Sequence, residues 1–221
     1  MRGGLSTFGV GSNSWRGLGR VVLGSLRKKS EKFFARIGRL ISPVITPMGL
    51  TILGLLSAVV ATLFYSYRHL FWAGVAILFS GLFDVLDGVV ARISNRATGF
   101  GGTLDALVDR YTEFFYVLGP ALGGYVDWPL AFVTMFSIIA SSYVRARAES
   151  VGGMKDASVG VLERVEKILI IAAATFLNPF INGIIWFSMI MMIILGQITV
   201  LQRLYATWKF WSTKKPVQPV V

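Results

Sequence analysis

The sequence predicts an all-α integral membrane protein, in which six transmembrane helices follow an amphipathic juxtamembrane helix on the cytosolic face. Of the 221 residues, 54% are hydrophobic and only 15% are charged, and the mean hydropathy is +0.66. Soluble domains usually carry about 25% charged residues. Six apolar segments are each close to the ~20 residues that a helix needs to cross a bilayer. They cover residues 46–67, 70–92, 102–124, 128–149, 161–180 and 183–206.

Two basic segments precede the first span. Residues 1–23 are rich in Gly, Ser and Arg and lack an apolar core with a cleavage site, so we interpret them as a flexible cytosolic tail and not a signal peptide. Residues 24–43 interleave Lys and Arg with Phe and Ile, which is typical of an amphipathic helix on the cytosolic leaflet. A basic tail that only sets topology is the alternative. A six-span domain over residues 44–208 and a cytosolic C-terminal tail over residues 209–221 follow.

The distribution of positive charge predicts the orientation in the membrane. The net charge is +11 and the pI is near 10.3, with Lys and Arg gathered at segment ends and in the tails. This pattern fits anionic lipid and the positive-inside rule better than nucleic-acid binding. With six spans, both termini lie in the cytosol and only Arg68 among the Lys and Arg lies outside. We expect a multi-pass protein of the plasma membrane.

Four aspartates interrupt the apolar segments at the cytosolic ends of the second and third spans. Asp84 and Asp87 are three residues apart, and Asp105 and Asp109 are four apart, so each pair shares one helix face. A carboxylate within the membrane costs roughly 2.5–3.5 kcal/mol. Divalent cations between the two acidic faces would compensate, and metal-assisted chemistry is the first hypothesis. The chain has no cysteine, and His69 is its one histidine, so thiolate and histidine metal sites are excluded.

Glycines accompany the aspartates. Gly88 follows Asp87 directly and lets a ligand or a neighbouring helix approach the backbone closely. Gly101 and Gly102 open the predicted third span, where free backbone N–H groups and the helix dipole favour a phosphate group. The sequence therefore places a phosphate-binding element beside the acidic faces.

The run Asp84-x-x-Asp87-Gly88-x-x-Ala91-Arg92, eight residues, Gly101-x-x-x-Asp105-x-x-x-Asp109 resembles the signature of the CDP-alcohol phosphotransferase family at every fixed position. The six-span layout extends the resemblance over most of the chain. Members of this family transfer a phosphatidyl-type group from a CDP-linked lipid to the hydroxyl of a small alcohol and release CMP. The resemblance implies this activity and a homodimer in the membrane, while the distribution of charge predicts no nucleic-acid partner.

The resemblance also implies roles for the signature residues. Asp84, Asp87 and Asp105 would hold one divalent cation, and Asp109 would complete a second metal position and act as the general base. Oxygen ligands alone suit two Mg²⁺ or Mn²⁺ ions. Residues that would bind the CDP group are Asp84, Gly88, Ala91, Arg92, Gly101 and Asp105.

A second cluster concerns the acceptor. The run Ser142-Tyr-Val-Arg145-Ala-Arg147-Ala-Glu149 ends the fourth span, Glu163-Arg164 opens the fifth, and Gln202-Arg203 closes the sixth. Arginine matches phosphate oxygens in a bidentate manner, so several arginines favour a phosphorylated acceptor. The cluster resembles the branch of the family that uses inositol phosphate, and Arg145, often Lys in bacterial members, favours the archaeal, archaetidyl-type donor. The residues that would hold the phosphate are Ser142, Arg145, Arg147, Arg164 and Arg203.

Other interpretations stay open at this stage. Glycerol 3-phosphate is the rival acceptor, and the arginines fit a purely topological role as well. The aspartates could be structural partners of Arg92, Arg96 and Arg110, or could line the path of a cation or proton transporter. Against a transporter, spans four to six offer no polar ladder toward the outside. Glu113, one turn beyond Asp109, could support the site or only contact a helix.

Overall fold

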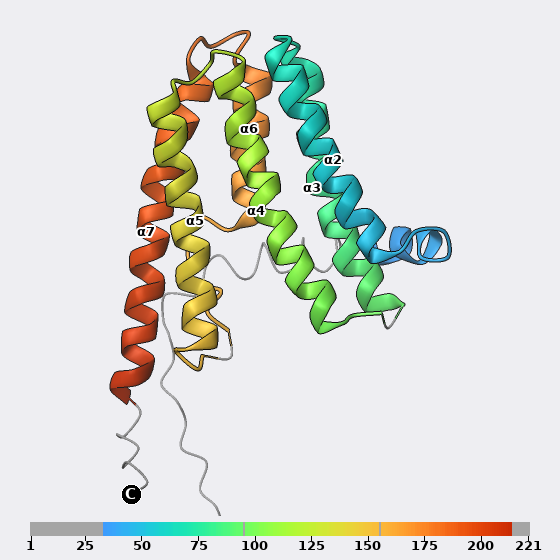
Figure 1. Cartoon of the computed structure of the whole chain (residues 1–221), viewed down its shortest axis with the longest axis vertical. Helices are drawn as coiled ribbons and strands as arrows, with labels where there is room; N and C mark the ends of the chain where they lie inside the picture. The colour runs from blue at the N-terminus through green and yellow to red at the C-terminus, as the bar shows by residue number, and fades with distance from the viewer. Residues whose placement is uncertain (1–32, 95, 155, 214–221) are drawn as a thin grey trace, which may run out of the picture.

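The computed structural model describes residues 33–94, 96–154 and 156–213, and this part of the chain is helical without strands (Figure 1). The prediction for the tail over residues 1–23, the first part of the segment 24–43, and residues 214–221 of the predicted tail 209–221 lie outside the described residues; residues 209–213 of that tail belong to α7. A helix over residues 33–41 comes first. The long helices that follow are α2 (Pro47–Ser66), α3 (Leu70–Ile93), α4 (Gly99–Leu122), α5 (Trp128–Ser150), α6 (Arg164–Leu177) and α7 (Ile184–Thr213).

Local capping explains where several helices begin. Thr46 caps α2, because its hydroxyl accepts the N–H of Gly49 at 3.1 Å and Pro47 follows in the first turn. The carboxylate of Asp127 accepts the N–H of Leu130 at 2.9 Å and caps α5. At α6, Glu166 accepts the backbone N–H of Glu163 at 3.1 Å. Side-chain oxygens that accept backbone N–H groups thus mark the starts of these helices.

The boundaries differ from the predicted spans in three places. α4 begins at Gly99, before the predicted start at residue 102, because Thr98 acts as its N-cap. α6 covers only Arg164–Leu177, and α7 continues to Thr213, beyond the predicted end at residue 206. No proline or glycine follows Gly196 within α7, so nothing in its sequence ends the helix earlier.

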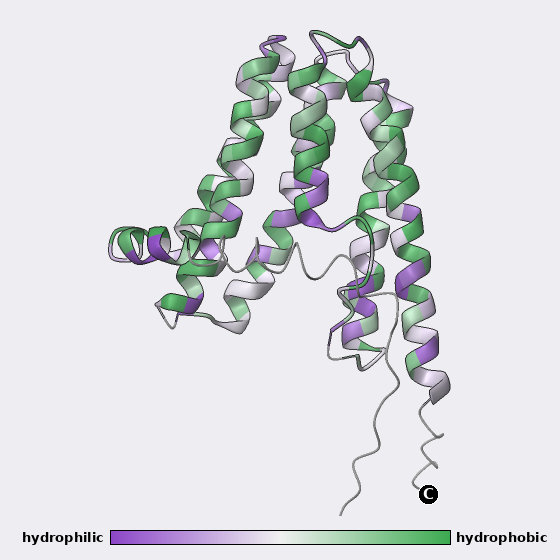
Figure 2. Cartoon of the chain, turned by 180° about the vertical axis from the view of Figure 1, so that it is seen from behind, coloured by the Kyte–Doolittle hydropathy of each residue, from purple (hydrophilic) through white to green (hydrophobic). Residues whose placement is uncertain are grey.

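Four of the described helices, α2, α3, α5 and α7, are long and apolar enough to cross a membrane. α4 carries four charged residues, Asp105, Asp109, Arg110 and Glu113, and α6 has only 14 residues. Figure 2 shows the hydropathy along the bundle: apolar residues dominate the upper half, and hydrophilic residues gather in the lower half. The turns α2–α3, α4–α5 and α6–α7 share the upper end, while the α3–α4 loop and the end of α7 lie at the lower end (Figure 1).

The main core fills the upper part of the bundle. α2 packs against α3 and α4, α5 packs against α7, and α6 contacts both α3 and α7. Tyr65 is fully buried there, and its hydroxyl is hydrogen-bonded to Thr175 Oγ1, which ties α2 to α6. Gly119 of α4 lies so close that an added Cβ would be 2.6 Å from the Tyr65 ring. Small residues therefore set the close approach of α2 and α4.

The helix over residues 33–41 extends sideways from the lower end of α2 (Figure 1). Its apolar residues Phe34, Ile37 and Ile41 pack against a small core of Leu50, Leu86 and Val90 at the lower ends of α2 and α3. Arg36 and Arg39 are exposed. The described part of the predicted amphipathic helix is thus helical, with an apolar face on the bundle and a basic face away from it.

Candidate metal and phosphate site

Three of the four predicted aspartates converge at the lower halves of α3 and α4. Carboxylate oxygens of Asp84, Asp105 and Asp109 lie within 4.8 Å of one another, and all three residues are half-buried. Asp84 comes from α3, and the other two stand one turn apart on α4. α3 ends at Ile93 and α4 begins at Gly99, and Figure 1 shows these two helix termini at the same end of the bundle, which brings the acidic faces to one level.

The fourth aspartate has a different environment. Asp87 is buried, and its Oδ2 accepts a hydrogen bond from the hydroxyl of Thr51 on α2 at 2.7 Å. Asp87 is not part of the group whose oxygens lie within 4.8 Å. Thr51 was not singled out from the sequence, because it is 36 residues away in the chain and lies inside an apolar helix.

Arg164, the first residue of α6, supplies positive charge to the aspartates. Its guanidinium donates a hydrogen bond to Asp109 and forms an ion pair with Asp84, and it lies 3.9 Å from Asp105 Oδ1. The sequence placed Arg164 with the acceptor phosphate. In the structure the same guanidinium also neutralises the acidic cluster, which a half-buried group of like charges requires.

The acidic cluster fits a divalent cation. Asp105 Oδ1 is buried and has no hydrogen-bond partner in the described structure, which leaves an acceptor that a cation would satisfy. All the metal ligands that this group offers are carboxylate oxygens on two helices, and hard oxygen ligands suit Mg²⁺ and Mn²⁺. The residues that could hold the metal are therefore Asp84, Asp105 and Asp109, whose carboxylate oxygens converge.

A cavity of about 340 Å³ lies on the side of the cluster toward α2 and the α3–α4 loop. Five of the six residues predicted to bind the CDP group line it, and Asp84 is the exception. These five are Gly88, Ala91, Arg92, Gly101 and Asp105. Thr46, Thr51 and Arg96 also line this cavity, and none of them was assigned to the site from the sequence.

One detail of the predicted phosphate element was wrong. Gly101 does line the cavity, but its N–H is not free, because it donates to the hydroxyl of Thr98 at 3.0 Å. The N–H of Gly102 likewise donates to the Thr98 carbonyl at 3.0 Å. The helix begins earlier than predicted, so the N–H groups of the first turn belong to Gly99 and Phe100.

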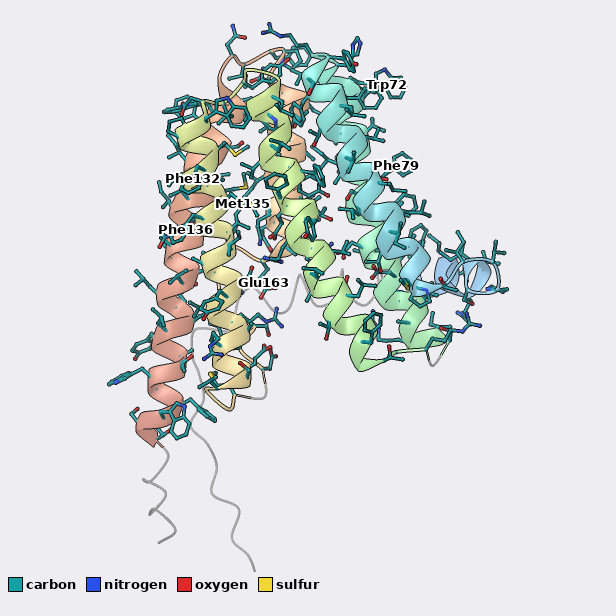
Figure 3. All side chains as sticks on the ribbon, viewed as in Figure 1. Trp72, Phe79, Phe132, Met135, Phe136 and Glu163 are labelled. Atoms are coloured by element: carbon teal, nitrogen blue, oxygen red, sulfur yellow. The ribbon has the colours of Figure 1, made fainter. Side chains whose placement is uncertain are left out.

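A larger cavity of about 660 Å³ lies on the other side of the cluster, between α4, α5 and α6. Figure 3 shows Glu163, which lines it, in the space between the lower halves of α4 and α5. Four of the five residues predicted to hold the acceptor phosphate line this cavity, namely Ser142, Arg145, Arg164 and Arg203. Asp109 also lines it, and Asp105 lines both cavities. The two cavities therefore meet at the acidic cluster.

Arg147 is the predicted acceptor residue that the structure does not bring to this cavity. It is exposed and is not among the lining residues. Residues two apart on a helix point in widely different directions, so Arg145 and Arg147 do not share a face. The motif alone could not distinguish the two arginines.

Arg203 has two roles at the larger cavity. It is buried, and its Nε and one terminal nitrogen donate to the carbonyls of Val159 at 2.8 Å and Ser141 at 2.6 Å. These bonds tie α7 to α5 and to the loop before α6. Arg203 therefore fixes the wall of the larger cavity as well as contributing positive charge to it.

Glu149 supports the same wall from α5. Its Oε1 accepts from Arg145 Nε at 3.1 Å and from the backbone N–H of Ala157 at 3.1 Å. Asp156 lies 3.8 Å from Arg145, and hydrogen bonds from the Ser158 side chain and backbone keep the pKa of Asp156 below its usual value. Arg145 thus faces two carboxylates that restrict its position at the cavity rim.

A buried ionic network lies one turn above Asp109. Glu113 and Lys167 are 3% and 5% exposed and form an ion pair, and Arg110 lies 2.7 Å from the second oxygen of Glu113. Arg110 also donates to the hydroxyl of Ser142. Arg110 and Lys167 both line the larger cavity. Glu113 therefore contacts two site-lining cations; the sequence had left open whether it supports the site or contacts a helix.

Comparisons with known proteins give a consistent picture. The family described as CDP-alcohol phosphatidyltransferase matches residues 44–205. An archaetidylinositol phosphate synthase from Pyrococcus horikoshii is 34% identical over 189 residues, which cover 85% of this chain and 97% of that protein. A phosphatidylinositol phosphate synthase from Mycobacteroides abscessus is 35% identical over 198 residues, covering 80% and 86% of the two chains.

The fold is similar to that of solved structures. Crystal structures of the phosphatidylinositol phosphate synthase from Mycobacterium tuberculosis are 27% identical in sequence to this chain. The form with bound CDP-DAG has a TM-score of 0.69 and covers 84% of this chain and 99% of its own. The form in complex with manganese and citrate has a TM-score of 0.70, with 83% and 93% covered.

Proposed function

Since this chain belongs to the CDP-alcohol phosphatidyltransferase family, we propose that it transfers an archaetidyl- or phosphatidyl-type group from a CDP-linked lipid to a hydroxyl of inositol phosphate and releases CMP. The observation that carries the proposal is the pair of cavities that meet at Asp105. A donor in one cavity and an acceptor in the other would bring their reacting groups together at the acidic cluster.

The smaller cavity suits the CDP head of the donor. Gly88 and Ala91 have small side chains that leave space in its wall, and Arg92 supplies positive charge. Asp87 lies in the wall with its carboxylate held by Thr51. The crystal structure of the mycobacterial synthase with CDP-DAG supports a CDP-linked donor.

We assign metal binding to Asp84, Asp87, Asp105 and Asp109, as the family resemblance implies for two Mg²⁺ or Mn²⁺ ions. Such ions would neutralise the donor diphosphate and stabilise the departing CMP. The manganese complex of the mycobacterial synthase supports a divalent cation in this fold. The convergence of three of these carboxylates within 4.8 Å supports at least one shared position.

Asp109 is the proposed general base. It lines the acceptor cavity and lies in the acidic cluster, so it can take the proton of the attacking hydroxyl. The acceptor oxygen then forms a bond to the lipid-bearing phosphorus, and the bond from that phosphorus to the CMP oxygen breaks. Arg164 contacts Asp109 and would limit where its carboxylate points.

Inositol phosphate is the proposed acceptor for two reasons. The relatives at 34% and 35% identity are named archaetidylinositol phosphate and phosphatidylinositol phosphate synthases. The larger cavity also has a cationic lining that suits a phosphate group, supplied by Arg110, Arg145, Arg164, Lys167 and Arg203. The phosphate of glycerol 3-phosphate would bind the same cationic residues. An experiment must therefore show whether the acceptor carries an inositol ring.

The proposed setting is a plasma membrane crossed six times, with both termini and the acidic cluster on the cytoplasmic side. The segregation of hydrophilic residues to one end of the bundle supports this orientation (Figure 2). The positive-inside rule places that end in the cytosol. The helix over residues 33–41 would then lie on the cytosolic leaflet, and the homodimer implied by the family stays a prediction.

Release of CMP tests the proposal. Purified protein with a CDP-linked lipid and Mg²⁺ should release CMP when inositol 3-phosphate is added, and not with serine or free inositol. Asp109→Asn should abolish release. Asp127→Asn is the matched control. It makes the same chemical change in the turn between α4 and α5, at the end of the bundle opposite the acidic cluster, and asparagine caps α5 as well as aspartate does. Faster release with glycerol 3-phosphate would overturn the acceptor but not the family chemistry.

A further inference from the structure

The end of the bundle opposite the aspartates contains a separate cavity of about 530 Å³. It forms where the α2–α3 turn, the residues after α4 and the α6–α7 turn come together (Figure 1). Arg68, His69, Tyr125 and Asn178 line it, together with the first residues of α3. The transfer reaction uses none of these residues.

Arg68 brings a positive charge to this cavity. In the described part of the chain no acidic residue forms an ion pair with it, and it is the single Lys or Arg in the turns at this end. Its backbone has φ of 61°, a left-handed conformation that non-glycine residues rarely adopt. Glycine is the usual residue at such a helix C-terminus. Arg68 therefore adopts a backbone conformation that is unfavourable for arginine, and its guanidinium lines the cavity.

Asn178 gives a second, independent indication of a ligand. It is only 8% exposed and lines the cavity, and its side-chain amide has no hydrogen-bond partner among the described residues. Its backbone N–H is already used by the Ala174 carbonyl at 2.9 Å. The amide is not one of the fully enclosed polar atoms without a partner, so it is open to the cavity and can pair there with water or with a bound group. An amide N–H₂ can donate to an anionic oxygen.

The start of α3 completes an anion-binding environment. His69 is its N-cap residue and makes no side-chain capping bond, so the first N–H groups of this 24-residue helix lie at the cavity. The positive end of the helix dipole favours an anion there. The guanidinium, the amide and the helix terminus thus provide three kinds of donor around one space.

Aromatic residues surround the opening. Phe71 and Trp72 are 62% and 55% exposed, and their rings stack edge to face at 5.4 Å. Figure 3 shows Trp72 near the upper end of the bundle, at the level of the turns. Aromatic rings of this kind are typical of the membrane–water interface. A ligand at this level would contact both a polar cavity and the apolar surface of the bundle.

We propose that this cavity binds the phosphate group of a membrane phospholipid, in the leaflet opposite the acidic cluster. Arg68, the Asn178 amide and the N-terminus of α3 hold the phosphate, and Phe71 and Trp72 contact the glycerol and the first part of the acyl chains. The site holds lipid and performs no chemistry, so it does not depend on the proposed transfer reaction.

Native mass spectrometry of the detergent-solubilised protein, titrated with dioleoylphosphatidylglycerol, measures the binding. Arg68→Gly should weaken it roughly tenfold, the effect of one lost charge-assisted bond. The same change relieves the left-handed backbone, so the Tm should not fall. Asn178→Asp, which is isosteric and adds a negative charge, should also weaken binding. Arg39→Gln, a loss of charge at the other end of the bundle, should leave it unchanged.

Two further arms identify the recognised group. Dioleoylglycerol lacks a phosphate, and its weaker binding should not respond to Arg68→Gly. Inorganic phosphate at millimolar concentration should displace part of the Arg68-dependent phosphatidylglycerol. Equal phosphatidylglycerol affinity in wild type, Arg68→Gly and Asn178→Asp would overturn the site. Arg68-dependent binding of inorganic phosphate without Arg68-dependent binding of the lipid would overturn the lipid assignment.

Discussion

The hydroxyl of Thr51 donates a 2.7 Å hydrogen bond to Oδ2 of Asp87, and both residues are buried between α2 and α3. This bond fixes one carboxylate of the signature from a helix that carries no signature residue. Asp87 consequently faces the smaller cavity in a defined position, while the other three aspartates face one another or Arg164. The donor side of the site therefore depends on α2.

Thr51→Val should weaken donor binding. The change keeps the shape of the side chain and removes a bond to a charged group, which is worth about 1.5–3 kcal/mol. We expect KM for the CDP-linked lipid to rise about 10-fold or more, with KM for inositol phosphate unchanged. Thr51→Ser keeps the hydroxyl and should stay close to wild type. An equal rise in both KM values would show that Thr51 acts on the whole fold and not on Asp87.

Arg164→Gln and Arg147→Gln test whether the lining of the larger cavity identifies the acceptor-binding arginines better than the sequence motif does. Arg164 lines the larger cavity, and Arg147 is exposed outside it. Steady-state kinetics should show kcat/KM for inositol phosphate about 10-fold lower or more in Arg164→Gln, as expected for the loss of a hydrogen bond to a charged group worth about 1.5–3 kcal/mol. Arg147→Gln should change kcat/KM little. An effect of similar size in both variants would mean that Arg147 reaches the acceptor and that the cavity is not its binding site.

The buried pair of Glu113 and Lys167 should contribute strongly to stability once one partner is removed. Lys167→Met leaves Glu113 with Arg110 alone, whereas Glu113→Gln leaves Lys167 buried without an acidic partner. Unpaired buried charges cost about 3–5 kcal/mol. Denaturant unfolding in detergent should show Glu113→Gln as the more destabilised variant, and the double variant should recover part of the loss. Additive losses would contradict a direct pair.

The close approach of α2 and α4 predicts a steric effect at Gly119. An added Cβ there would lie 2.6 Å from the Tyr65 ring and 3.2 Å from the Thr62 backbone. Gly119→Ala should lower the free energy of unfolding by about 1–3 kcal/mol, as overpacking does. Gly99→Ala is the control, because no atom lies within 4 Å of its added Cβ. If Gly119→Ala is as stable as wild type, the helices are packed less closely than described.

Much of the fold could be predicted because the apolar segments are long and separated by turn residues. The boundaries of α2, α3 and α5 lie within about two residues of the prediction, as is typical of strongly patterned helices. The start of α4 was misplaced because Thr98 was not recognised as an N-cap. The glycines that follow suggested the helix start, but capping by a hydroxyl decided it.

Residues of the site were predictable where one motif contained them. The aspartate signature fixes its own spacing, so the convergence of α3 and α4 followed from helix geometry. Contacts between distant helices were not predictable: the bond from Thr51 to Asp87 and the pair of Glu113 with Lys167 join residues 36 and 54 apart in the chain. Only packing decides which polar residue of an apolar helix faces which neighbour.

The central claim is that carboxylates of α3 and α4 share divalent cations. Electron paramagnetic resonance of Mn²⁺, titrated into the detergent-solubilised wild type and into Asp105→Asn, measures this without turnover. We expect wild type to bind Mn²⁺, Asp105→Asn to lose most of that binding, and Asp127→Asn to match wild type. Mn²⁺ binding by Asp105→Asn as tight as by wild type would contradict a metal held at the junction of the two cavities.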